Sequence, residues 1–133
     1  IEIAKYLVEE AGKYGITPDR IHLDPLVIAL ATDNSSMLSF IDTMKVIKDL
    51  YPTIKITSGL SNISFGMPLR KAVNQAFLTL VTFFGMDSAI MDPCNRDMIA
   101  ALLATEALMG KDRHCRKYNN AYRKGIIGPK KDA

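Results

Sequence analysis

The stretch IKITSGLSNISFGMP, residues 54–68, contains a strand, a turn and the start of a helix. Its alternating apolar residues predict the strand. Pro68 suits the first position of a helix, where a proline loses no hydrogen bond. The turn between them has no carboxylate, lysine or histidine, and its small or amide-bearing residues are Ser58, Gly59, Ser61, Asn62, Ser64 and Gly66. We therefore asked what needs so many neutral hydrogen-bonding groups at the end of a strand.

Two further strands are predicted on either side of this one. The runs RIHLDPL (20–26) and DSAIMDP (87–93) are short, apolar and end in an Asp-Pro pair. Proline cannot donate to a sheet ladder, so each strand should end at its aspartate, Asp24 or Asp92.

Helices are predicted between and around the strands from apolar residues spaced three and four apart. Gly15 should end the first helix, the loop 32–36 should cap the second, and Asn95 should cap the fourth. The last helix should carry Cys115, Tyr118 and Tyr122 along one side. The expected ranges are 1–14, 37–47, 68–84, 95–109 and 113–124.

Strands that alternate with helices predict a parallel α/β sheet, with Asp24, Asn62 and Asp92 at its carboxyl edge, where ligands bind in such folds. A doubly wound sheet and consecutive units of a TIM-type barrel both fit this order. The chain lacks a glycine-rich dinucleotide or phosphate loop, which argues against dinucleotide binding.

Composition sets limits on function. The 133 residues are 48% hydrophobic and 23% charged with a net charge of +3, which suits one globular domain and no nucleic-acid partner. No apolar run is long enough to span a membrane. Cys94 and Cys115 match no metal-ligand spacing, so we expect reduced thiols, a cytoplasmic protein and no bound metal. The first residue, Ile1, suggests a chain that begins inside a longer one.

Three segments together resemble a known family. GLSNISFGMPLRKAVNQAFLTLVTFFGMDSAIMDP (59–93), IHLDPLV (21–27) and ATEALMGKDRHCRKYNNAYRKG (104–125) are similar to methyltetrahydrofolate:corrinoid protein methyltransferases. The last segment resembles stand-alone members rather than cobalamin-dependent methionine synthase. Dihydropteroate synthases share the barrel, but the arginine and lysine of their equivalent turn are replaced here by Asn62 and Ile63.

The resemblance implies a pterin-binding (β/α)₈ barrel, of which residues 1–133 would be the last three strands and their helices, with a C-terminal helix and loose tail from about residue 113. It implies methyltetrahydrofolate or tetrahydrofolate as substrate and a corrinoid (cobalamin) carried by a partner protein. The first five strands have no counterpart in the chain, so we expect the chain alone to be inactive.

The resemblance also assigns site residues. Asn62 would be catalytic, donating a hydrogen bond to pterin N5, where negative charge develops as the methyl group leaves. Asp24 would accept the N3–H and 2-amino group of the pterin. Further folate contacts would come from Ser61, Ser64, Phe65 and Arg70. For the two serines, satisfying the loop backbone is an equal alternative. Asp24 could instead simply end its strand, and Asn62 could merely cap a turn. Arg70 could be a plain surface charge.

A second class of function stays open at this stage: a non-catalytic half-barrel that binds pterin or completes a partner barrel. Parallel strands that are apolar on both faces would leave an exposed apolar inner face and two open edges. We therefore expect the isolated chain to self-associate.

Overall fold

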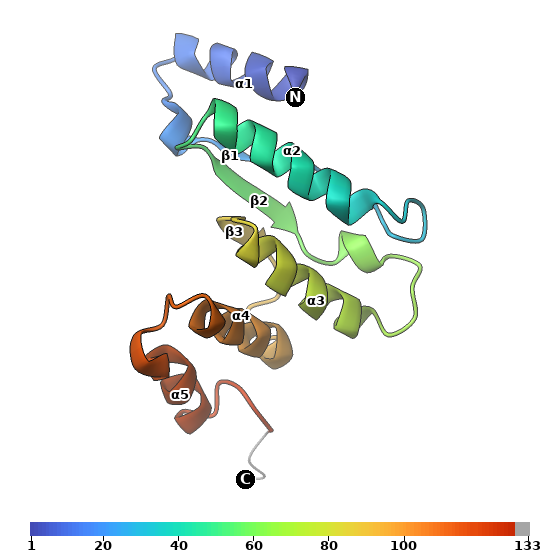
Figure 1. Cartoon of the computed structure of the whole chain (residues 1–133), viewed down its shortest axis with the longest axis vertical. Coiled ribbons are helices and arrows are strands. Elements are labelled where there is room, and N and C mark those ends of the chain that lie inside the picture. The colour runs from blue at the N-terminus through green and yellow to red at the C-terminus, as the bar shows by residue number, and fades with distance from the viewer. Residues whose placement is uncertain (130–133) are drawn as a thin grey trace.

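The computed structural model describes residues 1–129, in which helices and strands alternate in the predicted order (Figure 1). Residues 130–133 of the expected tail lie outside the described part. Three 3₁₀ turns, η1 (Pro18–Arg20), η2 (Asn62–Ser64) and η3 (Arg113–Cys115), complete the list of elements. The main elements are α1 (Glu2–Lys13), β1 (His22–Leu23), α2 (Ser36–Leu50), β2 (Lys55–Gly59), α3 (Arg70–Phe83), β3 (Ser88–Ile90), α4 (Arg96–Leu108) and α5 (Arg116–Arg123).

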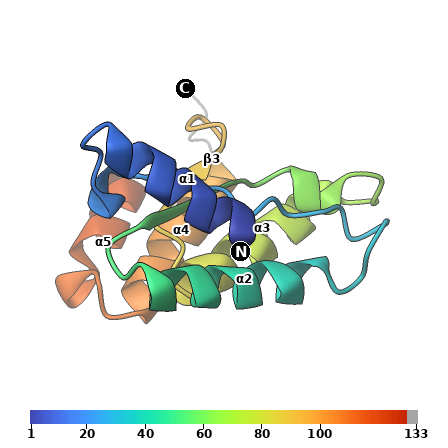
Figure 2. The ribbon, with the colours of Figure 1, turned by 90° about the horizontal axis from the view of Figure 1, so that it is seen from above.

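The three strands form one parallel sheet in the order β1-β2-β3. His22 pairs with Lys55, and Thr57 pairs with Ser88. Parallel pairing brings the carboxyl ends of all three strands to one edge, as predicted. Figure 2 shows the loops that follow β1 and β2 extending on that same side, beyond the sheet.

The hydrophobic core lies between the sheet and its helices. Ile54 and Ile56 are completely buried and belong to one core cluster with Met44 of α2 and Phe77 of α3. Phe77 also meets Phe40 of α2 edge to face, with ring centroids 5.9 Å apart. Burying one such side chain stabilises a fold by about 1.5–3 kcal/mol, so this layer holds both helices on the sheet.

The opposite face of the sheet is open and largely polar. Its residues alternate with the buried ones along β1 and β2 and include His22, Lys55 and Thr57, and Ser88 of β3 pairs with Thr57. The apolar exception is Ile90, which is 70% exposed. The expectation of strands that are apolar on both faces was therefore wrong. The apolar inner face we invoked for self-association is absent from residues 1–129, and oligomerisation stays a prediction.

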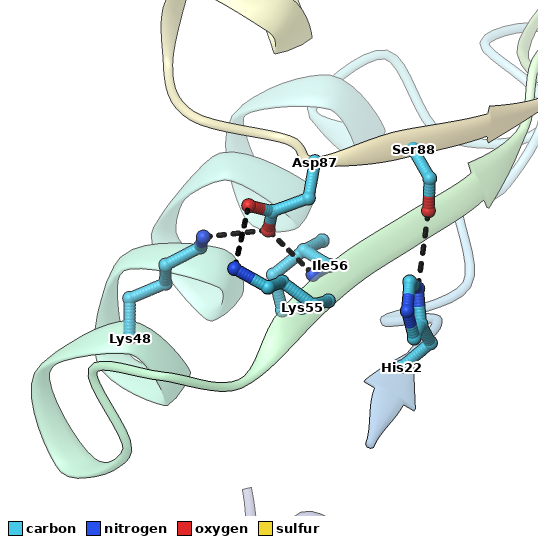
Figure 3. Close-up of polar contacts among 6 residues, drawn as sticks. All are labelled: His22, Lys48, Lys55, Ile56, Asp87 and Ser88. Atoms are coloured by element: carbon cyan, nitrogen blue, oxygen red, sulfur yellow. Dashed lines mark hydrogen bonds and ion pairs between the residues drawn. The ribbon is translucent and has the colours of Figure 1, made fainter. Parts of the chain in front are cut away.

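Side chains from the two outer strands meet across the open face. His22 Nδ1 of β1 lies 3.2 Å from Ser88 Oγ of β3, with β2 between them (Figure 3). Two strands that are not neighbours can be bridged in this way when the sheet curves toward that face. Such curvature is what a segment of a closed barrel requires.

Helix starts differ from the sequence prediction at two places. Helix α3 begins at Arg70 rather than Pro68, because Leu69 adopts a left-handed φ of 48° and turns the chain first. The loop before α2 gives no side-chain cap to the helix. Instead, Asp33 accepts hydrogen bonds from the backbone N–H and hydroxyl of Ser35, and the Ser36 hydroxyl donates to the Ile28 carbonyl.

Helix α5 is shorter than predicted. The left-handed residues His114 and Cys115 precede it, and the Asp112 carboxylate accepts the N–H groups of Lys117 and Tyr118 in its first turn. The buried residue of the helix is Ala121. Cys115 precedes the helix rather than belonging to it, and Tyr118 and Tyr122 on α5 are exposed.

The segment after α5 is fastened to α4 over its described residues. Arg96 donates hydrogen bonds to the carbonyls of Gly125 and Gly128, and Ile127 is 2% exposed. Residues 125–128 are therefore held in place rather than loose. Asn95 caps α4 as predicted, by accepting the N–H of Met98 at 3.2 Å. No helix within residues 1–129 has the length and hydropathy to cross a membrane.

An ion-pair network joins α2, β2 and β3 at the amino end of the sheet. Asp87 accepts hydrogen bonds from Lys48 Nζ at 2.6 Å and from the Ile56 N–H at 2.8 Å, with Lys55 4.0 Å away (Figure 3). Partial burial raises the pKa of Asp87, but these hydrogen bonds and lysine charges lower it by more. The pKa therefore lies below its ordinary value.

This network predicts an acid-sensitive contribution to stability. Because the folded-state pKa is lowered, the contribution is present above the unfolded-state pKa of about 4 and is lost as the pH falls through the folded value. We expect Asp87→Asn to lower the free energy of unfolding by about 1–2 kcal/mol at pH 7 and by much less near pH 3. Urea unfolding at both pH values measures this. Asp49→Asn, an exposed aspartate of α2, is the control.

Candidate functional site

The candidate site lies in the loops at the carboxyl edge of the sheet, and Asn62 is its central residue. Asn62 opens the short turn η2 immediately after β2, and its side chain is exposed. Its amide Nδ2 donates to the Val27 carbonyl at 2.5 Å. This bond fixes which way the amide faces and leaves one N–H and the carbonyl oxygen Oδ1 for a ligand.

Two further contacts join the loop after β1 to the loop after β2. The Leu30 N–H donates to the Ile63 carbonyl at 2.9 Å. Gly66 has a φ of 78°, and a Cβ at that position would lie 3.5 Å from the Cβ of Ala31. The glycine thus permits a left-handed turn where the loops touch. The sequence could not have predicted these contacts, because their acceptors are backbone carbonyls, and every residue has one.

Asp24 and Asp92 form the same local structure. Oδ1 of Asp24 accepts the Leu26 N–H at 2.8 Å, and Oδ1 of Asp92 accepts the Cys94 N–H at 2.8 Å. Each aspartate thereby turns the chain after its strand. Both oxygens of Asp24 keep lone pairs that can accept from a ligand. The two aspartates differ in the loop that follows each of them. The loop after Asp24 contains Val27, whose carbonyl accepts the hydrogen bond from the Asn62 amide.

Arg70 holds the η2 turn from the start of α3. Its Nε donates to Ser64 Oγ at 3.0 Å and its Nη2 to the Ser61 carbonyl at 2.7 Å. Ser64 is fully buried and also donates to the Ser61 carbonyl. The sequence left two roles open for the Ser64 hydroxyl, contact with the pterin and a hydrogen bond to the loop backbone. In the structure the hydroxyl bonds to the loop backbone. The exposed Phe65 ring lies beside Arg70, with its centroid 5.9 Å from the guanidinium carbon.

The structure thus brings Asn62, Ser61, Ser64, Phe65 and Arg70 into one turn and connects that turn to the loop that follows Asp24. The turn carries a single charge, that of Arg70, which is engaged with the loop itself. Within residues 1–129, no three His, Cys, Asp or Glu side chains come together as metal ligands would. The site is therefore suited to a neutral ligand that exchanges hydrogen bonds with amide and carboxylate groups.

A parallel sheet with this edge and this curvature is what a pterin-binding barrel needs, and the chain belongs to the family of pterin binding enzymes, whose model matches residues 2–92. The family resemblance inferred from the sequence is thereby confirmed, and the barrel is the correct choice of the two α/β architectures.

Individual relatives are more specific. The chain is 58% identical over 129 residues to a protein of Eubacterium limosum named methylcorrinoid:tetrahydrofolate methyltransferase, covering 97% of this chain and 48% of that protein. It is 36% identical over 98 residues to the methionine synthase of Mycobacterium tuberculosis, covering 68% of this chain and 8% of that protein. The chain therefore spans about half the length of the first relative and a small part of the second.

The role of Arg70 gives a prediction for the site. Lysine has one ammonium group and cannot reproduce the two separate donors of the guanidinium. We expect Arg70→Lys to lower stability by about 1 kcal/mol and to speed amide hydrogen exchange at Phe65 and Met67, whose N–H groups bond within the turn. Hydrogen exchange by mass spectrometry measures this, and Arg123→Lys on α5 is the control. Unchanged exchange in the turn would show that Arg70 does not hold it.

Proposed function

We propose that this chain carries part of the folate site of an enzyme that moves a methyl group between N5 of tetrahydrofolate and the cobalt of a corrinoid borne by a partner protein. The observation that carries this proposal is the fixed amide of Asn62 in an almost uncharged turn at the carboxyl edge of the sheet. Membership of the pterin binding family supports the folate, and the name of the Eubacterium limosum relative supports the corrinoid.

The chemistry explains the preference for a neutral donor. When the methyl group leaves N5 for Co(I), the carbon–nitrogen bond breaks, a cobalt–carbon bond forms, and the electron pair stays on N5. Negative charge therefore grows on N5 only in the transition state. An amide N–H directed at N5 forms its strongest hydrogen bond at that point, which is the kind of binding that raises the rate.

The amide also serves the opposite direction, which is the one that the Eubacterium limosum relative's name states and the one we propose for this chain. In this direction the N5 lone pair forms the new carbon–nitrogen bond, the cobalt–carbon bond breaks with its electron pair left on cobalt as Co(I), and the proton that tetrahydrofolate carries on N5 is released to water. Oδ1 of Asn62 can accept a hydrogen bond from that N–H, since the Val27 carbonyl occupies only Nδ2. A lysine could not do so, because an ammonium group has no acceptor.

In this proposal Asp24 contributes to the affinity for folate rather than to the rate of methyl transfer. The N3–H and 2-amino groups of the pterin lie side by side and match the two oxygens of one carboxylate. Ser61 and Phe65 are exposed in the Asn62 turn and are proposed as folate contacts. Arg70 and Ser64 act by holding that turn. The exposed, unpaired cysteines Cys94 and Cys115 favour a reducing compartment, and the cytoplasm is the one we propose.

We predict that Asn62→Ala, in a full-length protein carrying this sequence, lowers the methyl-transfer rate by roughly 10²-fold or more, the usual scale for losing one preorganised donor. Folate binding should weaken far less, because the bond strengthens mainly in the transition state. Stopped-flow kinetics with a Co(I) corrinoid and calorimetry with methyltetrahydrofolate measure the two effects. Asn119→Ala on α5 is the control. A single-turnover rate that stays at the parent value would remove Asn62 from the mechanism.

Asp24→Asn should have the opposite pattern, with folate affinity lost first. The amide accepts one of the two hydrogen bonds and turns its NH₂ against a donor, which should cost roughly 1.5–3 kcal/mol, or about tenfold or more in Kd. Asp92→Asn is a closely matched control, because Asp92 forms the same turn before the same kind of proline-containing loop. An affinity for tetrahydrofolate within twofold of the parent would contradict the assignment of Asp24.

A further inference from the structure

A polar contact crosses the open face of the sheet close to the candidate site. His22 Nδ1 of β1 lies 3.2 Å from Ser88 Oγ of β3 (Figure 3). A hydrogen bond joins the two groups in either neutral tautomer of the ring, because a hydroxyl both donates and accepts. His22 is level with Lys55 and Ser88 is level with Thr57, so the contact runs diagonally across β2. We call it the cross-strand bridge.

The bridge lies on the face that becomes the interior of a barrel, since the helices cover the opposite face. Branched apolar side chains normally fill such an interior. At His22 and Ser88 the chain instead has one directional bond between two strands that are not neighbours. A hydrogen bond weakens steeply when its angle or length changes, whereas apolar side chains tolerate small displacements. The bridge therefore fixes β1 relative to β3 more narrowly than apolar packing would.

The segment that the bridge fixes most directly is the one that leads into Asp24. Strand β1 consists of two residues, His22 and Leu23, and Asp24 comes immediately after the last paired residue. Leu23 is buried, whereas His22 and Asp24 on either side of it are exposed. Side chains two residues apart in a strand lie on the same face, so His22 and Asp24 share the open face.

Other contacts hold the chain beyond Asp24. Its Oδ1 accepts the Leu26 N–H at 2.8 Å, and the Val27 carbonyl accepts the amide of Asn62. Asp24 is thus held by its loop on one side and by the cross-strand bridge on the other. A carboxylate that accepts two adjacent N–H groups needs this support, because functional groups must be held within about 0.5 Å of their productive position.

We propose that His22 and Ser88 are positioning residues of the folate site, which act by holding Asp24 where it can accept both pterin N–H groups. This inference rests on the proposed function, because it requires Asp24 to bind the pterin. Neither residue contacts the reacting atoms. Loss of the bridge should therefore weaken folate binding and leave the transfer step, which depends on Asn62, unchanged.

The test uses calorimetry with tetrahydrofolate on a full-length protein carrying this sequence. Ser88→Ala removes the hydroxyl and should raise the Kd about fivefold, within the range of coupling between groups of one hydrogen-bonded network. Ser88→Thr keeps a hydroxyl on a residue that suits a strand, so its Kd should stay within about twofold of the parent. Ser39→Ala, which removes an exposed hydroxyl from α2, is the matched control. The single-turnover rate at saturating tetrahydrofolate, with methylcobalamin as donor, should be unchanged in all three variants.

A double-mutant cycle determines whether the bridge acts through Asp24. In an Asp24→Asn background the paired acceptors are already lost, so adding Ser88→Ala should change the Kd by less than about twofold. His22→Phe keeps an aromatic ring but removes both ring nitrogens. It should raise the Kd as much as Ser88→Ala does, and the two changes together should have no larger effect than either alone.

A Kd at the parent value in Ser88→Ala would overturn the positioning role and leave the proposed function intact. A loss of affinity that persists in the Asp24→Asn background would also overturn it, because the bridge would then act on something other than Asp24. So would loss of the folded state in both Ser88→Ala and His22→Phe, seen by urea unfolding, since the role would then be purely structural. A parent that binds no tetrahydrofolate, or an Asp24→Asn variant with the parent's affinity, would instead overturn the proposed function on which the inference rests.

Discussion

The parallel pairing of β2 with both of its neighbours is the constraint from which the rest of the structure follows. The register that aligns His22 with Lys55 and Thr57 with Ser88 points all three strands the same way. Each strand must then be followed by a crossing helix, which covers one face of the sheet. The same direction brings three loops to one edge, so the pairing that builds the core also assembles the site.

The two faces of the sheet are specialised by the alternation along each strand. One face buries Ile54 and Ile56 under α2 and α3. The other exposes polar groups and curves enough for His22 to reach Ser88 across the middle strand (Figure 3). At the amino end, Asp87 ties β3 to β2 and α2 through charged hydrogen bonds. This charged network thus lies at the amino end of the sheet, away from the loops of the candidate site.

The absence of charged residues from the 60–69 turn has a physical advantage in the proposed reaction. A fixed positive charge beside the pterin would stabilise the ground state as well as the transition state and so would add little to the rate. The structure instead uses backbone carbonyls and an arginine engaged with the turn to position one amide. Residues 25–32 and 60–69 around that amide contain no charged side chain, so a ligand that approaches the amide removes water from no charged group of these loops.

The sequence alone determined the order of helices and strands, the turns at Asp24 and Asp92 that follow β1 and β3, and the family, because apolar periodicity, proline chemistry and the residues of the 59–66 turn are local properties. It placed the end of β3 at Asp92, whereas the strand ends at Ile90. It failed at the start of α3, where the left-handed backbone of Leu69 delays the helix, and where distant segments decide the outcome. The polarity of the open face, for example, depends on which residues of each strand the helices cover. Likewise, the Ser64 hydroxyl is occupied because Arg70 folds back over the turn, and the Asn62 amide is oriented by a carbonyl 35 residues away. Local patterns specify which groups are available, whereas only packing between distant segments decides which of them remain free for a ligand.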